Sequence, residues 1–225
     1  MAAWERGLAT PFSPDLPARL RLETRDLHVA TERTGAMAAL LGGRLARPAY
    51  CTMLRNLHAL YAALEAALRE RQHDAAIAPL QAQALQREPA LSADLRALHG
   101  PHWATELTLQ AATAHYVQRL QTLAQNGSPA LVAHAYVRYL GDLHGGQILK
   151  RLVARGVGLP EDAQGRTAGT QFYEFGDQAQ VLRLRQQLRH ALGVLPVSMA
   201  EQDLIVAEAR WAFVQHQRLF EQLPA

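Results

Sequence analysis

Apolar residues recur every three or four positions along most of the chain, which is the period of an α-helix with one buried face. Short stretches containing Gly42-Gly43, Pro89 and Asn126-Gly127 separate the periodic runs. The longest predicted helices span about 16–33, 48–72, 102–127, 129–157 and 198–222. The pattern predicts an all-α fold, a single-domain helical bundle of about eight helices over 16–222, after a flexible N-terminal segment, 1–15.

Composition supports this fold class and narrows the partners. The chain has 225 residues, 49% of them hydrophobic, which suffices for one sizeable core. The formal charge is +3 and the sequence pI is about 9.3, but the basic residues are spread along the helices. We therefore expect no nucleic-acid partner; an acidic protein or a small anionic molecule fits this charge.

Cys51 is the only cysteine, so no disulfide framework can form within the chain. The N-terminal stretch "MAAWERGLATPFSPD" has no apolar core of the signal-peptide kind, and no run of about 18 apolar residues occurs. We expect a cytoplasmic protein without a membrane partner, and a monomer.

One predicted helix contains an unusual group of glycines, in "RYLGDLHGGQILKR" (138–151). Gly141, Gly145 and Gly146 each cost a helix interior about 0.5–1 kcal/mol relative to alanine. A helix cap would account for glycines at a helix end, although here the apolar stripe continues for two turns beyond them. Close packing of two helices would also favour glycine, and so would a flat ligand lying against the backbone.

Helical geometry favours the ligand. At about 100° per residue, Gly141 and Gly145 lie on one stripe, with Asp142 and His144 roughly 80° to either side. A bare strip flanked by an acid and an imidazole suits a ligand platform and has no use in packing alone.

A second arrangement lies on the first predicted helix. Arg21, Arg25, His28 and Glu32 are spaced so that one helical face carries all four. A solvated face of ion pairs with a structural histidine is one interpretation. In the other, His28 binds a metal, Glu32 accepts the proton of the second ring nitrogen, and the arginines hold carboxylates. Heme, with an iron centre and two propionates, fits the two helices together.

The sequence then resembles the heme oxygenase family. "LVAHAYVRYLGDLHGGQILKRL" (131–152) is very similar to that family's distal-helix signature, and "TRDLHVATE" (24–32) resembles its proximal-histidine helix. The similarity extends over about 16–222.

The resemblance implies a fold in which heme lies between a proximal and a distal helix. It also implies an enzyme that uses dioxygen and external electrons to convert heme to biliverdin, ferrous iron and carbon monoxide. Heme b is then both cofactor and substrate. His28 matches the axial iron ligand, Asp142 the distal carboxylate that orders water, and Gly141 and Gly145 the glycines against the heme face.

The resemblance assigns further site residues. Tyr61, Tyr116, Tyr136 and Arg138 fall on or near the family's distal polar network. Arg21, Arg25 and Arg183 suit the propionates. A second family cation aligns with Gln187, so Arg185 or Arg189 would replace it. Phe213 lies on the last helix, which lines the pocket in the family.

Two positions depart from the family pattern. His144 stands where a small residue, often serine, is usual; it points outward, joins the distal water network or ligates the iron. His216 stands where an asparagine is frequent, and we expect its imidazole to titrate near neutrality.

Two other functions fit parts of the pattern. A heme carrier or sensor would need no acid such as Asp142 beside the open coordination site. A thiaminase-like enzyme would need a nucleophile in the pocket, and Cys51 lies outside any stretch placed there. For the oxygenase, a ferredoxin, flavodoxin or flavin reductase is the expected soluble electron donor.

Overall fold

The computed structural model describes residues 15–159 and 167–223, and the regular elements of these ranges are helices. The predicted all-α class is therefore confirmed. The expected flexible segment, 1–15, lies outside the described residues except for Asp15. The elements are α1 (Leu16–Glu23), α2 (Arg25–Glu32), α3 (Gly35–Leu41), α4 (Arg47–Glu70), η1 (Ala78–Leu80), η2 (Gln83–Leu85), α5 (Glu88–Leu98), α6 (Trp103–Glu106), α7 (Ala111–Gln125), α8 (Leu131–Ala135), η3 (Tyr136–Leu140), α9 (Gly141–Gly156), η4 (Gln171–Tyr173), α10 (Gln178–Gly193) and α11 (Met199–Gln222).

Local sequence explains where several helices begin. Asp15 accepts a hydrogen bond from the backbone N–H of Ala18 at the start of α1. Asp177 caps α10 in the same way, and Ser198 forms a capping box with Glu201 at the start of α11. Each cap satisfies backbone N–H groups that the first helical turn leaves without partners.

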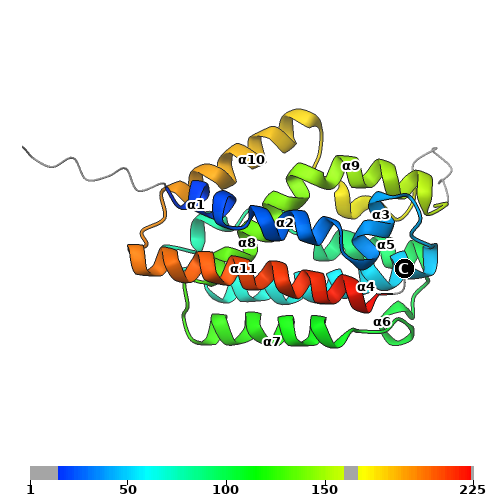
Figure 1. Ribbon diagram of the computed structural model, residues 1–225, viewed down its shortest axis with the longest axis horizontal. Coiled ribbons are helices and arrows are strands. Elements are labelled where there is room, and N and C mark those ends of the chain that lie inside the picture. The colour runs from blue at the N-terminus through cyan, green and yellow to red at the C-terminus, as the bar shows by residue number, and fades with distance from the viewer. Residues whose placement is uncertain (1–14, 160–166, 224–225) are drawn as a thin grey trace, which may run out of the picture.

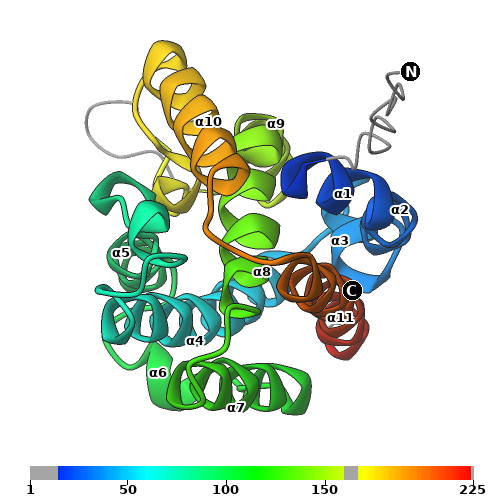
Figure 2. The ribbon, with the colours of Figure 1, turned by 90° about the vertical axis from the view of Figure 1, so that its left-hand side faces the viewer.

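The other helices are arranged around α8 and α9. Figure 1 shows α11 running along the molecule, with α7 below it and α2 and α10 above. Seen end-on in Figure 2, α8 and α9 pass through the middle, with α4 and α7 below and α1 to α3 to one side. Fully buried leucines on α4, α5 and α7, among them Leu64, Leu91 and Leu120, fill the interior between these helices.

The first predicted helix is broken, which the periodicity did not indicate. Thr24 leaves the helical region (φ −112°, ψ 1°), and its Oγ1 donates to the carbonyl of Leu20, so α1 ends and α2 begins. Arg21 and His28 therefore stand on two different helices. The prediction that they share one continuous face is wrong.

The glycine-bearing helix contains a wider turn. Residues Tyr136–Leu140 form a π-helical segment between α8 and α9. Such segments rotate all later residues relative to a regular α-helix and occur frequently at functional sites. Arg138 within the segment pairs with Asp142 four residues on, with 3.0 Å between Arg138 Nη2 and Asp142 Oδ1.

Gly35 sets the distance between α3 and α11. Its φ is +45°, and an added Cβ would lie 2.1 Å from the carbonyl oxygen of Phe220. The left-handed conformation and the absent side chain are thus both required where α3 begins.

We predict that Gly35→Ala lowers the free energy of unfolding by about 2–4 kcal/mol, because strain and overpacking act together. Urea denaturation measures this loss. Gly43→Ala is the matched control, since Gly43 has φ +66° but an added Cβ meets nothing within 4 Å. It should lose only about 1 kcal/mol. Equal losses in the two variants would show that contact with Phe220 is not the cause.

Candidate functional site

A cavity of about 260 Å³ lies between α2 and α9, bounded on its inner side by α3, α4, η4 and α11. Most of its wall is apolar, which suits a flat, largely hydrophobic ligand. Apolar wall residues include Met37, Leu40, Met53, Leu57, Leu149, Phe172, Phe213 and Phe220.

The α9 glycines divide into two kinds. Gly141 and Gly145 line the cavity. A Cβ added to Gly141 would meet nothing within 4 Å, and one added to Gly145 would touch only the Leu149 side chain at 3.9 Å. Gly146 faces Tyr173 instead. Close helix packing therefore accounts for Gly146 but leaves the other two glycines with open space above them.

His28, on α2, stands opposite the α9 glycines. Its side chain is 54% exposed, and its Nδ1 faces Glu32 Oε1 at 3.8 Å, which leaves Nε2 as the nitrogen available to a ligand. The ring packs edge-on against Phe213, with 5.8 Å between ring centroids. Both His28 and Glu32 line the cavity.

Arg138 is the centre of the polar wall. Its guanidinium donates to the hydroxyl of Tyr61 (3.0 Å), to Asp142 Oδ1 (3.0 Å) and to His216 Nε2 (3.1 Å). Tyr61 in turn donates to Asp142 Oδ2. The fork of Arg138 thus fixes three side chains from α4, α9 and α11 around one edge of the glycine strip.

Asp142 is 8% exposed. Burial raises the pKa of its carboxyl well above the ordinary value, and burial lowers the pKa of Arg138 to about 10. Each buried charge therefore depends on the other, since an isolated carboxylate at this depth would take up a proton.

His216 does not titrate as expected. Its Nδ1–H donates to the carbonyl of Ala212 at 2.7 Å, so Nε2 is the acceptor that faces Arg138. Burial and the neighbouring Arg138 charge lower the pKa of His216 to about 3. The prediction of titration near neutrality is wrong, because this ring stands buried beside a permanent cation.

His144 points away from the cavity floor. It is exposed, and its Nδ1 donates to the carbonyl of Leu140 at 2.7 Å. Partial burial lowers its pKa, and the charges of Arg185, Arg189 and His28 act in the same direction. The structure shows the outward orientation and no contact between His144 and Asp142.

Two of the predicted network tyrosines lie elsewhere. Tyr136 stands beside Thr24; burial raises its pKa, while Thr24, Arg21 and Arg189 lower it. Tyr116 donates to His134 Nδ1 (2.8 Å) and packs edge-on behind His216. Neither tyrosine has a hydrogen bond to Asp142, because the π segment and the depth of α7 carry their hydroxyls to other neighbours.

Two of the arginines predicted to bind the propionates, Arg25 and Arg183, have other neighbours in the structure. Arg25 lines a shallow groove on the surface with Asp26 and Arg210, because the break at Thr24 turns α2. Arg183 is exposed and donates to Gln180 Oε1 at 2.6 Å. The cations whose charges reach the rim near His144 and Tyr136 are Arg185, Arg189 and Arg21.

Sequence reasoning missed two parts of the site and a buried ion pair behind it. The α3 and α4 wall, including Met37 and Met53, and the η4 residues Phe172 and Tyr173 have no local signal that marks them as ligand-facing. The buried pair His134–Glu208 had one: Glu208 interrupts the apolar stripe of α11, and a charge in such a stripe needs a partner.

A family model described as "Heme oxygenase" matches residues 14–222. The chain is 32% identical to "Heme oxygenase 1" of Rattus norvegicus over 222 residues, which cover 98% of this chain and 75% of the rat protein. It is 35% identical to "Heme oxygenase 2" of Synechocystis over 215 residues, covering 93% and 83% of the two chains.

Solved structures show the same similarity. A heme oxygenase from Leptospira interrogans matches with a TM-score of 0.86 at 33% identity, covering 93% of this chain and 100% of that one. Heme oxygenase-2 from Synechocystis, solved in complex with heme and NO, matches with a TM-score of 0.85 at 35% identity, covering 92% and 84%.

The state of His216 leads to a prediction about pH. Its folded-state pKa lies below the ordinary value of His, so the unfolded chain binds more protons as the pH falls below about 6.5. Its contribution to stability is therefore full above that pH and is lost toward pH 3, at about 1.4 kcal/mol per pH unit.

Replacement His216→Asn removes this proton uptake. Between pH 6 and pH 5, wild-type stability should fall by about 1.4 kcal/mol more than that of the variant, as measured by urea denaturation at both values. Parallel losses in the two proteins would show that His216 is protonated in the folded state at pH 5.

Proposed function

The chain belongs to the heme oxygenase family, and we propose that it holds heme flat against the backbone of Gly141 and Gly145, with His28 as the axial ligand of the iron. As a member of this family it is an oxidoreductase of heme degradation. The observation that carries the site is the open space above Gly141, where a Cβ would meet no atom within 4 Å. Glycine weakens α9 there without any packing reason.

The residues around that space fit heme b. His28 offers an imidazole nitrogen from one side, and the cavity wall supplies apolar contact for a flat ring. Rim cations from α10 and α1, namely Arg185, Arg189 and Arg21, suit its two propionates better than Arg25 and Arg183 do. His144, between the glycine strip and α10, borders the same rim.

When bound, heme supplies the iron that activates dioxygen and is itself the molecule oxidised, to biliverdin, ferrous iron and carbon monoxide. The chain's own part is to direct protons. Arg138 and Tyr61 hold Asp142 at the edge of the glycine strip, where its carboxyl can order water and hold a proton above the open face. His216 keeps Arg138 in place and accepts no proton itself at neutral pH.

The electrons come from outside the chain. We propose a soluble acidic donor of the ferredoxin, flavodoxin or flavin reductase kind, in the cytoplasm. The net charge of +3 and the exposed arginines of α10 support an acidic partner. No helix within the described ranges 15–159 and 167–223 combines the length and apolar character needed to cross a bilayer.

Replacing Gly141 by alanine should have opposite effects on the free and the loaded protein. The heme-free protein should gain about 0.5–1 kcal/mol of stability, since the site is helical and empty of contacts. Hemin affinity should fall about tenfold or more, because a methyl group beneath the ring costs about 1–3 kcal/mol of overpacking. Urea denaturation and hemin titration measure the two effects.

Gly146→Ala is the matched control, because Gly146 lies one residue further along α9 but faces Tyr173. It should leave hemin affinity nearly unchanged. His28→Ala, which leaves Gly141 in place, should remove the absorbance spectrum of imidazole-ligated heme. A Gly141→Ala variant that binds hemin as tightly as the wild type would exclude the glycine platform.

Asp142→Asn should separate binding from turnover. The amide keeps the volume and one acceptor oxygen for the Arg138 N–H, and its NH2 group can donate to the Tyr61 oxygen, so hemin should still bind. Biliverdin yield with ascorbate should fall about a hundredfold, the typical contribution of a positioned acid or base. The loss of the Soret band and the growth of the bilin band measure turnover.

Glu221→Gln, which removes an exposed acid at the end of α11, is the control and should turn over normally. Normal biliverdin yield from Asp142→Asn would remove the role proposed for this acid. Stable hemin in the wild type under the same conditions would instead indicate a carrier.

A further inference from the structure

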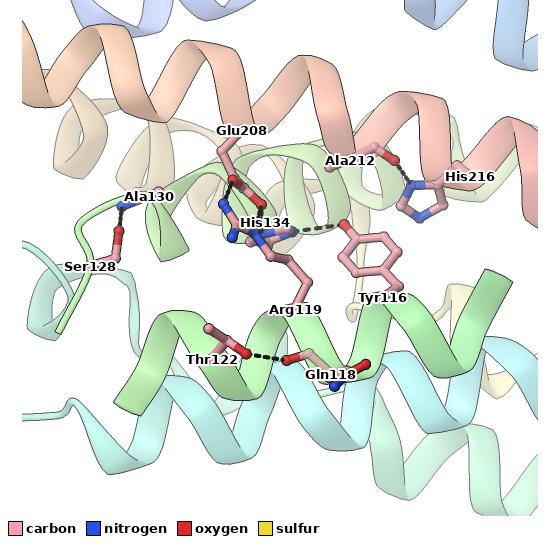
Figure 3. Close-up of polar contacts among 10 residues, drawn as sticks. All are labelled: Tyr116, Gln118, Arg119, Thr122, Ser128, Ala130, His134, Glu208, Ala212 and His216. Carbon is pink, nitrogen blue, oxygen red and sulfur yellow. Dashed lines mark hydrogen bonds and ion pairs between the residues drawn. The ribbon is translucent and has the colours of Figure 1, made fainter. Parts of the chain in front are cut away.

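A second buried polar chain lies directly behind the cavity wall. Tyr116 on α7 donates to His134 Nδ1 on α8 at 2.8 Å, and His134 Nε2 lies 3.2 Å from Glu208 Oε1 on α11. Figure 3 shows the hydroxyl of Tyr116 pointing at the His134 ring and the ring pointing at Glu208. His134 is fully buried, and Tyr116 is 1% exposed. The proposed proton chemistry at Asp142 does not use these groups.

The donor and the acceptor of each hydrogen bond between Tyr116, His134 and Glu208 can be assigned. Arg119 contributes two hydrogen bonds to Glu208, at 2.6 and 3.0 Å, and together with His134 it lowers the pKa of Glu208 to about 2. Glu208 is thus an acceptor, and His134 must donate from Nε2. Burial lowers the pKa of His134, so its Nδ1 carries a lone pair and Tyr116 must be the donor.

We propose that Tyr116 is a redox-active tyrosine, with His134 as its proton acceptor and Glu208 as the counter-charge of the resulting imidazolium. In the forward step, Tyr116 loses one electron to a peroxide-level oxidant and passes its hydroxyl proton to His134 Nδ1. The products are a neutral tyrosyl radical, an imidazolium paired with the Glu208 carboxylate, and the oxidant reduced by one electron. Re-reduction by one electron returns the proton to the tyrosine oxygen.

Three observations fit this role. The hydrogen bond is already formed at 2.8 Å, so the proton moves along an existing contact. Burial raises the pKa of Tyr116 far above its ordinary value, so the hydroxyl cannot ionise beforehand and electron loss must be coupled to proton loss. The positive charge formed on His134 is met by the Glu208 carboxylate within the same buried network.

Position links Tyr116 to the cavity and to the surface. His216 lines the cavity, and its ring centroid lies 5.2 Å from that of Tyr116. On the other side the ring of the partly exposed Trp211 lies 5.2 Å from that of Tyr116, between centroids. An electron can thus pass from Tyr116 toward an oxidant in the cavity, and spare the cavity methionines from oxidation.

Tyr61 is the competing site, since its hydroxyl also donates to a carboxylate, that of Asp142. Its ring, however, has the Arg138 guanidinium 5.1 Å away, and its oxygen accepts from Arg138 Nε. A cation over the ring opposes the removal of an electron. Tyr50 offers a neutral comparison, because its hydroxyl donates to the Gly169 carbonyl, which cannot take a proton.

The oxidation itself needs no heme, so its test is independent of the proposed function; only its role as a protective outlet for peroxide-level oxidants of heme turnover rests on that function. The heme-free full chain is photo-oxidised with ruthenium(III) trisbipyridine generated by flash and quench. Electron paramagnetic resonance of frozen samples and transient absorbance then follow the tyrosyl radical.

The wild type should give a tyrosyl radical whose formation is slower in D2O. Tyr116→Phe should lower the radical yield about tenfold, and Glu208→Gln, which keeps the shape but removes the charge, should slow formation about tenfold. Tyr50→Phe should match the wild type. Circular dichroism verifies that each variant is folded.

A radical that persists in Tyr116→Phe, or that disappears in Tyr61→Phe instead, would overturn the assignment. A rate of radical formation that is unchanged both in Glu208→Gln and in D2O would also overturn it, because hydrogen bonds with only a structural role transfer no proton.

Discussion

A single buried cation, the guanidinium of Arg138, holds the polar side of this cavity together. Its fork reaches Tyr61, Asp142 and His216, on three helices that are far apart in sequence. A charge at this depth is tolerated only because all of its neighbours accept hydrogen bonds from it. The acid among them, Asp142, is buried too, and burial raises the pKa of its carboxyl. His216 preserves this balance, because its ring offers a lone pair to Arg138 and is fixed by its hydrogen bond to the Ala212 carbonyl.

The same helix supplies the bare floor and the acid beside it. Arg138, in the π segment Tyr136–Leu140, pairs with Asp142 four residues on, and the next turn presents the backbone of Gly141 and Gly145 to the cavity. Glycine and the π turn both weaken a helix. The ligand proposed above would account for their joint presence in its centre, far from either end.

Single-helix geometry was predictable, and tertiary geometry was not. Gly141, Gly145 and Asp142 line one cavity, as their spacing indicated, because that spacing lies within one regular helix, α9. Arg25 was misplaced because the break at Thr24 arises from a side-chain hydrogen bond that periodicity cannot show.

The remaining misplaced or missed residues have the same cause. The position of Tyr136 depends on the π-helical segment in which it lies. The positions of the wall residues from α3, α4 and η4 depend on packing between segments that are distant in the sequence. His134 and Glu208 were visible only as polar residues on buried faces, and their pairing emerges when α8 and α11 are placed side by side.

The helix that offers the imidazole is itself weakly held. Helix α2 has eight residues, of which only Thr31 is buried, and Gln217 on α11 secures it through hydrogen bonds to the Leu27 carbonyl and Thr31 Oγ1, both at 3.2 Å. A ligand that contacts both α2 and α9 would therefore stabilise the packing of the N-terminal helices against the rest of the protein. By mass action, free ligand at a hundred times its dissociation constant adds about 2.7 kcal/mol to stability. With heme bound as proposed, the thermal lifetime of the chain would depend on heme supply, and the chain would be most exposed to proteolysis when its substrate runs out.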